Sequence, residues 1–185
     1  MVKTLFLDTE FTELTQKAQL ISLALVDAER EYSFYAEFTG FDRAGLSDWH
    51  FEHVIDNSLY ESESFVNKRN GAHWVVKGKR NLIVEQLNSF FDQFQSIEIW
   101  GDVLAYDWVL FCQLFGGAFE IPSQIFYISN DISNLLKFKG FNPDTARESL
   151  VDPAELKRLN SSGLKKHNAL YDAHLMAIIY KTLNA

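Results

Sequence analysis

The sequence predicts a mixed α/β fold, in which a sheet that starts with three antiparallel strands is flanked by helices. Three strand-like segments with short connections open the chain, and helical and strand-like segments alternate after residue 82. The chain has 185 residues, of which 47% are hydrophobic. A chain of this size buries roughly 70% of its unfolded surface in one core, so we expect residues 1–185 to form a single domain.

The N-terminal part is expected to form strands over 2–10, 20–27 and 32–38. Their short connections favour an antiparallel meander. The first strand has apolar residues on both faces, which is typical of a central strand. The segment 39–81 is polar with scattered aromatic residues, and within it we expect a helix over 48–55.

The second half is expected to alternate between helices over 82–94, 107–115 and 131–136 and strands over 97–100 and 124–128. Pro153 with Asp152 before it predicts a helix start, because aspartate caps helices and proline is favoured in the first turn. Apolar residues at 169, 173, 176, 177 and 180 predict the packing face of a last helix.

Composition limits the class of protein. The net charge is -8, which argues against a protein that coats nucleic acid, although an enzyme can still grip a few nucleotides through local basic residues. The single cysteine, Cys112, cannot form an internal disulfide, which fits a reducing compartment. No apolar run approaches the ~18 residues of a membrane span, and the first strand starts directly, without a signal peptide. We therefore expect a cytoplasmic protein without a membrane partner.

Asp8 and Glu10 place two carboxylates inside the first strand. Residues two apart in a strand point to the same face, so the two side chains can converge on one point. Ionised carboxylates are rarely buried without a partner, so the pair predicts a cation site. The alternative is an exposed strand end with two solvated acids, and the neighbouring Phe6 and Phe11 count against it.

His167 and Asp172 stand at the start of the last helix. Five residues apart, they would be separated by about 140° on a continuous helix, so His167 must come from the preceding loop or the first turn. From there it can approach a site that Asp172 reaches from the helix. The ordinary alternatives are an exposed histidine beside Lys165 and Lys166, and a solvated helix acid.

Together, Asp8-Thr9-Glu10, Asp107 and the pair His167 and Asp172 resemble the three motifs of DEDDh-class 3′–5′ exonucleases in the RNase H-like superfamily. The resemblance covers nearly the whole chain and is closest to small single-domain bacterial and phage exoribonucleases related to RNase T and oligoribonuclease. The middle motif departs from the family pattern, since Val103 stands where an asparagine is common. Asp102 is therefore a rival to Asp107.

The resemblance implies an RNase H-like, metal-dependent 3′–5′ exonuclease acting on single-stranded nucleic acid, with RNA favoured over DNA. It implies two Mg²⁺ or Mn²⁺ ions, held by Asp8, Glu10, Asp107 and Asp172, and His167 as the general base that takes a proton from the attacking water. A homodimer is left open. Two other functions also stay open: a catalytically silent nucleic-acid-binding module on the same fold, and a phosphodiesterase of dinucleotides or other small phosphodiesters.

Substrate contacts are expected at two places. The segment 68–80 contains basic residues and no acid, and we expect Lys77, Lys79 and Arg80 to bind phosphates. The alternative is a solvated loop, in which case the second basic group, near His167, is the better candidate. Phe11, next to Glu10, is expected to stack on a base.

Overall fold

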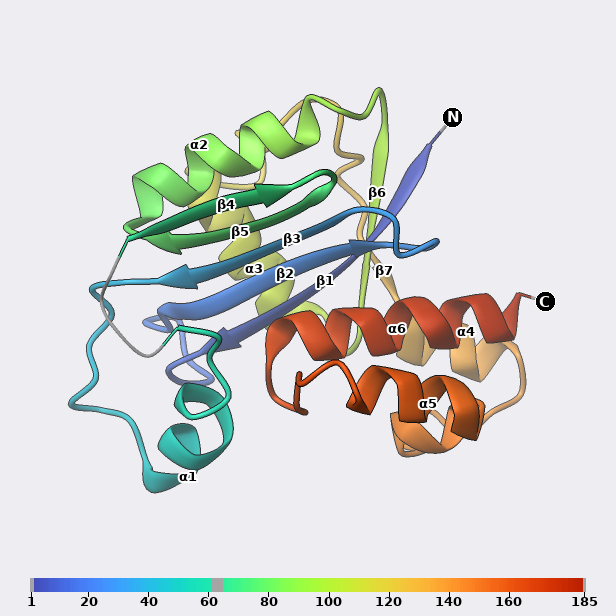
Figure 1. The fold of residues 1–185 in the computed structure, drawn as a ribbon. Coiled ribbons are helices and arrows are strands. Elements are labelled where there is room, and N and C mark those ends of the chain that lie inside the picture. Colours follow the sequence, from blue (N-terminus) through green and yellow to red (C-terminus); the bar gives the residue numbers. More distant parts are fainter. Residues whose placement is uncertain (1, 61–64, 185) are drawn as a thin grey trace.

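The computed structural model describes residues 2–60 and 65–184, and Figure 1 shows a twisted sheet with helices on both faces. The seven strands of this part run in the spatial order β4-β5-β3-β2-β1-β6-β7. Their bounds are β1 (Lys3–Phe11), β2 (Leu20–Asp27), β3 (Ser33–Phe38), β4 (Val66–Asn70), β5 (His73–Gly78), β6 (Ile97–Gly101) and β7 (Asn130–Asp131). The helices are α1 (Asp48–His50), the π-helix η1 (Phe51–Ile55), α2 (Arg80–Phe91), α3 (Ala105–Phe115), α4 (Ile132–Phe138), the 3₁₀-helix η2 (Arg147–Leu150), α5 (Pro153–Asn160) and α6 (Ala169–Leu183).

The expected antiparallel meander of three N-terminal strands is confirmed. β1 pairs antiparallel with β2, which pairs antiparallel with β3. On its other side β1 pairs parallel with β6, so β1 lies inside the sheet as expected. The register with β2 shifts between Glu10 and Phe11, and this bulge bends the end of β1.

Two sequence expectations are corrected. The segment 39–81 contains, besides the expected helix, the hairpin β4–β5, whose turn has Gly71 at φ 58° and whose second strand pairs parallel with β3. The expected strand 124–128 is wrong, because only Ile125 bridges to Ile97 and residues 126–128 are exposed. The edge strand beside β6 is instead the short β7.

The core lies in two layers, one on each face of the sheet. Leu5 and Leu7 of β1 point to the layer covered by α2 and α3. Phe6, between them, points to the layer covered by α4, α5 and α6. Cys112 of α3 is buried in the core. Asp8 and Glu10 continue the Phe6 face, so both carboxylates point toward the side of the sheet that α6 covers.

Helix α6 packs against β1 and β2 through alanines. Ala169, Ala173 and Ala177 recur every four residues and are fully buried (0% exposed) in the layer that contains Phe6. Asn168 caps the helix by accepting a hydrogen bond from the backbone N–H of Leu170. His167 therefore precedes α6, as the spacing argument predicts. No helix in residues 2–60 or 65–184 combines the length and apolar character that a membrane span needs.

Candidate active site

The C-terminal end of β1 opens into a cavity of about 1030 Å³. Asp8 and Glu10 line this cavity, together with Asp107 from α3, Asp172 from α6 and His167 from the loop before α6. The structure thus brings together all five residues that the resemblance assigns to the reaction, from three regions of the sequence.

Asp172 and His167 lie beside Glu10. One side-chain ligand atom from each of the three residues lies within 4.8 Å of the other two. The backbone N–H of His167 also donates to Asp172 Oδ2 at 2.9 Å. This hydrogen bond ties the loop that carries the imidazole to the helix that carries the carboxylate.

Asp107 is held at the cavity by β1. Its Oδ1 accepts two hydrogen bonds from Thr9, one from the backbone N–H at 3.0 Å and one from the hydroxyl at 2.7 Å. Thr9 faces the α3 side of the sheet, so it reaches Asp107 while Asp8 and Glu10 face the other way. Among the described residues, Asp107 Oδ2 has no hydrogen-bond donor.

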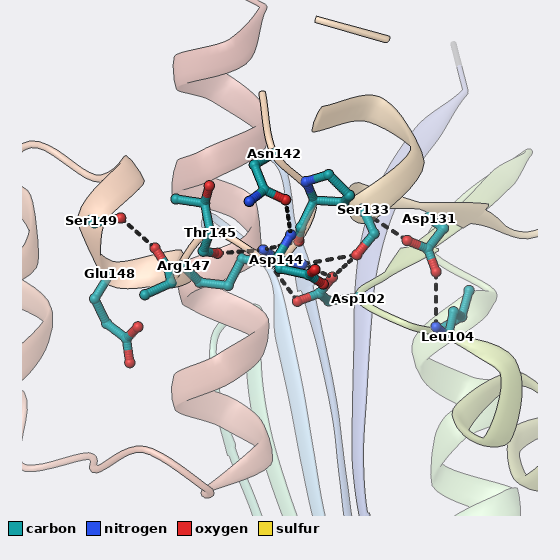
Figure 2. Close-up of polar contacts among 12 residues, drawn as sticks. Asp102, Leu104, Asp131, Ser133, Asn142, Asp144, Thr145, Arg147, Glu148 and Ser149 are labelled. Atoms are coloured by element: carbon teal, nitrogen blue, oxygen red, sulfur yellow. Dashed lines mark hydrogen bonds and ion pairs between the residues drawn. The ribbon is translucent and has the colours of Figure 1, made fainter. Parts of the chain in front are cut away.

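Asp102, the rival in the middle motif, is engaged differently. Arg147 donates to both of its carboxylate oxygens, at 2.6 and 2.8 Å, and the hydroxyl of Ser133 donates to Oδ1 at 2.8 Å. Figure 2 shows the contact of Arg147 with this carboxylate. Arg147 also donates to the carbonyls of residues 143 and 145. Because both oxygens of Asp102 are already bonded, the geometry favours Asp107 over Asp102 as a cation ligand.

Burial disfavours the charged forms of these four carboxylates, and repulsion between carboxylates adds to this effect at Asp8 and Glu10. Burial, with the nearby charges of Asp172 and Asp107, raises the pKa of Glu10 to about 9. Burial likewise raises the pKa of Asp172 to about 7. The pKa of Asp8 is raised by burial and by repulsion from Asp172 and Glu10, and burial raises that of Asp107. Without a cation, these groups cannot all be ionised at neutral pH.

A divalent cation fits this donor set. Among the described residues, no lysine or arginine forms an ion pair with Asp8, Glu10, Asp107 or Asp172. The two cationic side chains at the cavity are paired elsewhere, Arg147 with Asp102 and Lys166 with Glu148. Carboxylate oxygens are the preferred ligands of hard cations such as Mg²⁺ and Mn²⁺.

Phe11 lies at the rim of the same cavity. Its ring stacks on that of Tyr106, with centroids 6.0 Å apart and an angle of 25° between the planes. The Tyr106 hydroxyl donates to the carbonyl of Leu14 at 3.0 Å, which joins α3 to the loop after β1. The expected substrate-binding residue Phe11 is thus one of two adjacent aromatic rings beside the acidic residues.

The expected phosphate contacts at 77–80 are not brought to this cavity. Lys77 is buried and its ammonium lies 2.9 Å from Glu37 Oε2, which speaks against a phosphate contact by this side chain. Arg80 donates to the carbonyls of Gln113 and Leu114, where it caps the C-terminus of α3. Lys79 is exposed before α2, outside the cavity lining. Lys77 and Arg80 thus make contacts within the fold.

Two residues that shape the site were not predicted. Arg147 binds the carboxylate of Asp102 from 45 positions away, and Asn57 contacts the His167 loop from 109 positions away. No periodicity or short motif links residues so far apart. The ring of Trp49 also contacts that of His167, across a similarly long separation in the sequence.

The mixed sheet, with acidic residues on β1, α3 and α6 and a histidine before α6, defines the DEDDh class of RNase H-like 3′–5′ exonucleases. The family described as the 3′–5′ exoribonuclease Rv2179c-like domain matches residues 3–183. The chain belongs to this family, and it is therefore a hydrolase of the 3′–5′ exoribonuclease type.

Similar proteins agree with this assignment. Two relatives from Mycobacterium tuberculosis are the 3′–5′ exoribonuclease MT2234.1 of strain CDC 1551 / Oshkosh and the 3′–5′ exoribonuclease Rv2179c of strain ATCC 25618 / H37Rv. Each is 28% identical over 158 residues, which cover 83% of this chain and 88% of the relative. The X-ray structure of the RNase domain of the yeast Pop2 protein superposes with a TM-score of 0.57 and 11% identity, over 97% of this chain and 75% of that one. At this identity the likeness supports the fold alone.

Proposed function

We propose that the protein removes nucleotides one at a time from the 3′ end of single-stranded RNA, by a two-metal-ion mechanism with His167 as the general base. The observation that carries the proposal is the convergence of four carboxylates and one histidine in a single cavity, with no lysine or arginine of the described chain paired to those carboxylates. The middle ligand in this proposal is Asp107.

Asp8, Glu10, Asp107 and Asp172 would hold the divalent ions, Mg²⁺ or Mn²⁺. Two such ions, when bound, supply charge stabilisation to the attacking and leaving oxygens of a phosphodiester. The protein residues contribute a fixed arrangement of these carboxylates. Asp107 is oriented by Thr9, and Asp172 by the backbone of His167.

His167 is suited to accept a proton from the attacking water at a ring nitrogen. Burial lowers the pKa of His167, and the nearby Lys166 and His53 lower it further. The imidazole is therefore neutral at neutral pH, which is the form a general base needs.

Phe11 and Tyr106 would contact the base of the terminal nucleotide, since stacking on an aromatic ring tolerates every base. RNA is the proposed substrate because the family and both bacterial relatives carry the name exoribonuclease. We further propose that residues 1–185 act as one domain in the cytoplasm, in agreement with a single, buried cysteine.

The test uses RNA and DNA strands of equal sequence, labelled at the 5′ end and incubated with Mg²⁺ or with a chelator. We expect a ladder of products shortened from the 3′ end, formed from RNA, dependent on metal, and absent with Asp8→Asn. Cleavage of a dinucleotide without shortening of the longer strand would indicate the phosphodiesterase. Binding of RNA without cleavage would indicate the silent module.

A further inference from the structure

We propose that Asn57, which follows the π-helix η1 and lies far from the motifs in sequence, is a positioning residue that holds the main chain of His167 in its reactive conformation. The inference rests on the proposed role of His167 as the base. It concerns a part of the chain, residues 48–60, that carries none of the five reaction residues.

His167 has an unfavourable backbone conformation. Its φ is 62°, in the left-handed region that non-glycine residues rarely occupy. It stands at the third position of a turn closed by the N–H of Asn168, which donates to the carbonyl of Lys165 at 3.1 Å. A positive φ at that position is usually taken by glycine. A histidine stays in such a conformation only when its surroundings determine it.

Both polar ends of the peptide group that precedes His167 are held. The amide Nδ2 of Asn57 donates to the carbonyl of Lys166 at 2.9 Å. The N–H of the same peptide group, which belongs to His167, donates to Asp172 Oδ2 at 2.9 Å. The orientation of this peptide plane sets the φ of His167. Asn57 and Asp172 together therefore determine the direction in which the His167 side chain leaves the backbone.

Asn168, the residue after His167, forms hydrogen bonds with the backbone of Asn57 and with Tyr35. Asn168 is 2% exposed, and its Nδ2 donates to the backbone carbonyl of Asn57 at 2.8 Å and to the hydroxyl of Tyr35 at 3.2 Å. Asn57 therefore donates to the residue before the histidine and accepts from the residue after it. We call this reciprocal pair, Asn57 and Asn168, the histidine clamp.

The element that carries Asn57 also contacts the imidazole ring. The rings of Trp49 and His53 stack on each other at 4.9 Å, and both meet His167 edge-on, at 5.1 and 5.9 Å between centroids. Asn57 Nδ2 also donates to the carbonyl of His53 at 2.5 Å. One side-chain amide thus links the turn that holds the His167 backbone to the segment that packs on its ring. In Figure 1, α1 lies close to the loop that leads into α6.

The segment after Asn57 is anchored to the sheet by a buried ion pair. Glu37 Oε1 accepts from the N–H groups of Leu59 and Tyr60, at 2.6 and 3.3 Å. Lys77 donates to Glu37 Oε2 at 2.9 Å and to the carbonyl of Tyr60 at 2.5 Å. Lys77, which the sequence suggested as a phosphate ligand, therefore helps to fix the segment that follows Asn57.

The test compares Asn57→Ala and the nearly isosteric Asn57→Asp with a matched control, Asn88→Ala, an exposed asparagine of α2. Aspartate keeps the shape of the side chain but turns an acceptor toward the Lys166 carbonyl. For both Asn57 variants we expect kcat on labelled RNA with Mg²⁺ to fall by up to about 10²-fold, with KM unchanged. Melting curves identify which variants are folded at the assay temperature. If Asn57→Ala is not folded there, the kcat of Asn57→Asp is the deciding measurement.

A double variant separates positioning from a general loss of structure. If Asn57 acts through His167, Asn57→Ala combined with His167→Ala is no slower than His167→Ala alone. A wild-type kcat in the folded Asn57 variants, or a further full loss in the double variant, would overturn the clamp while leaving His167 as the base. A wild-type kcat in His167→Ala would overturn the proposed base and, with it, the clamp.

Discussion

Glu10→Gln tests whether the cavity is an acidic site that needs a cation. Burial raises the pKa of Glu10 from 4.5 in the unfolded reference to about 9. Between these two values the metal-free folded protein keeps a proton that the unfolded chain has released. The protonated Glu10 therefore makes its full contribution to the free energy of unfolding below the unfolded pKa. This contribution is lost as the pH rises toward the folded pKa.

The expected size follows from the shift. Each pH unit in this window lowers the free energy of unfolding by about 1.4 kcal/mol for one retained proton, so from about pH 5 to about pH 7 the loss is about 3 kcal/mol. For a chain of this length that corresponds to a fall of about 6–12 °C in Tm. Glutamine has no proton to release, so Glu10→Gln should lack this part of the pH dependence.

The assay is urea unfolding at several pH values with a chelator and again with Mg²⁺. The matched control is Glu13→Gln, an exposed carboxylate in the loop after β1, which is expected to follow the wild-type curve. Mg²⁺ should stabilise the wild type at neutral pH and stabilise Glu10→Gln much less. The reasoning is refuted if wild type and Glu10→Gln lose stability equally between about pH 5 and about pH 7 in the chelator.

Three further outcomes are expected. Asp107→Asn should abolish metal-dependent hydrolysis in a folded protein, whereas Asp102→Asn should retain measurable turnover; the reverse result would exchange the two ligand assignments. Lys77→Met leaves Glu37 buried without its partner, so the free energy of unfolding in urea should fall by about 3–5 kcal/mol, and KM measured well below the melting temperature should not rise. Phe11→Ala should raise KM for a short RNA by about 5- to 150-fold, the equivalent of one lost stacking contact, and an unchanged KM would place the terminal base elsewhere.

The sequence was informative wherever the chemistry is local. Asp8 and Glu10 could be placed on one face because a strand alternates, and His167 could be assigned to the loop before α6 because a helix has a fixed turn angle. The meander could be predicted because the connections between its strands are short. These inferences need only the period of one element or the length of one connection, and the structure agrees with each.

The rest depended on contacts between distant segments. In β4 the first residue is buried and the other four are exposed, so this edge strand shows no alternation. The apolar residues 126–128 resembled a strand, yet they are exposed beside a sheet edge that the sequence does not mark. The ion pair of Lys77 with Glu37 joins residues 40 positions apart, and without it the lysine looked free to bind phosphate.

The alanines of α6 limit which substitutions this helix can accept without altering the site. Ala169, Ala173 and Ala177 face the layer that contains Phe6, so the separation of helix and sheet is set by methyl groups. Asp172 is carried by the helix, and Asp8 and Glu10 by the sheet. Any larger side chain at these three positions would move one group of carboxylates away from the other. Residues without any chemistry of their own therefore set the distance between the carboxylates, and a mutational scan would find them as intolerant of substitution as the acids that they keep close together.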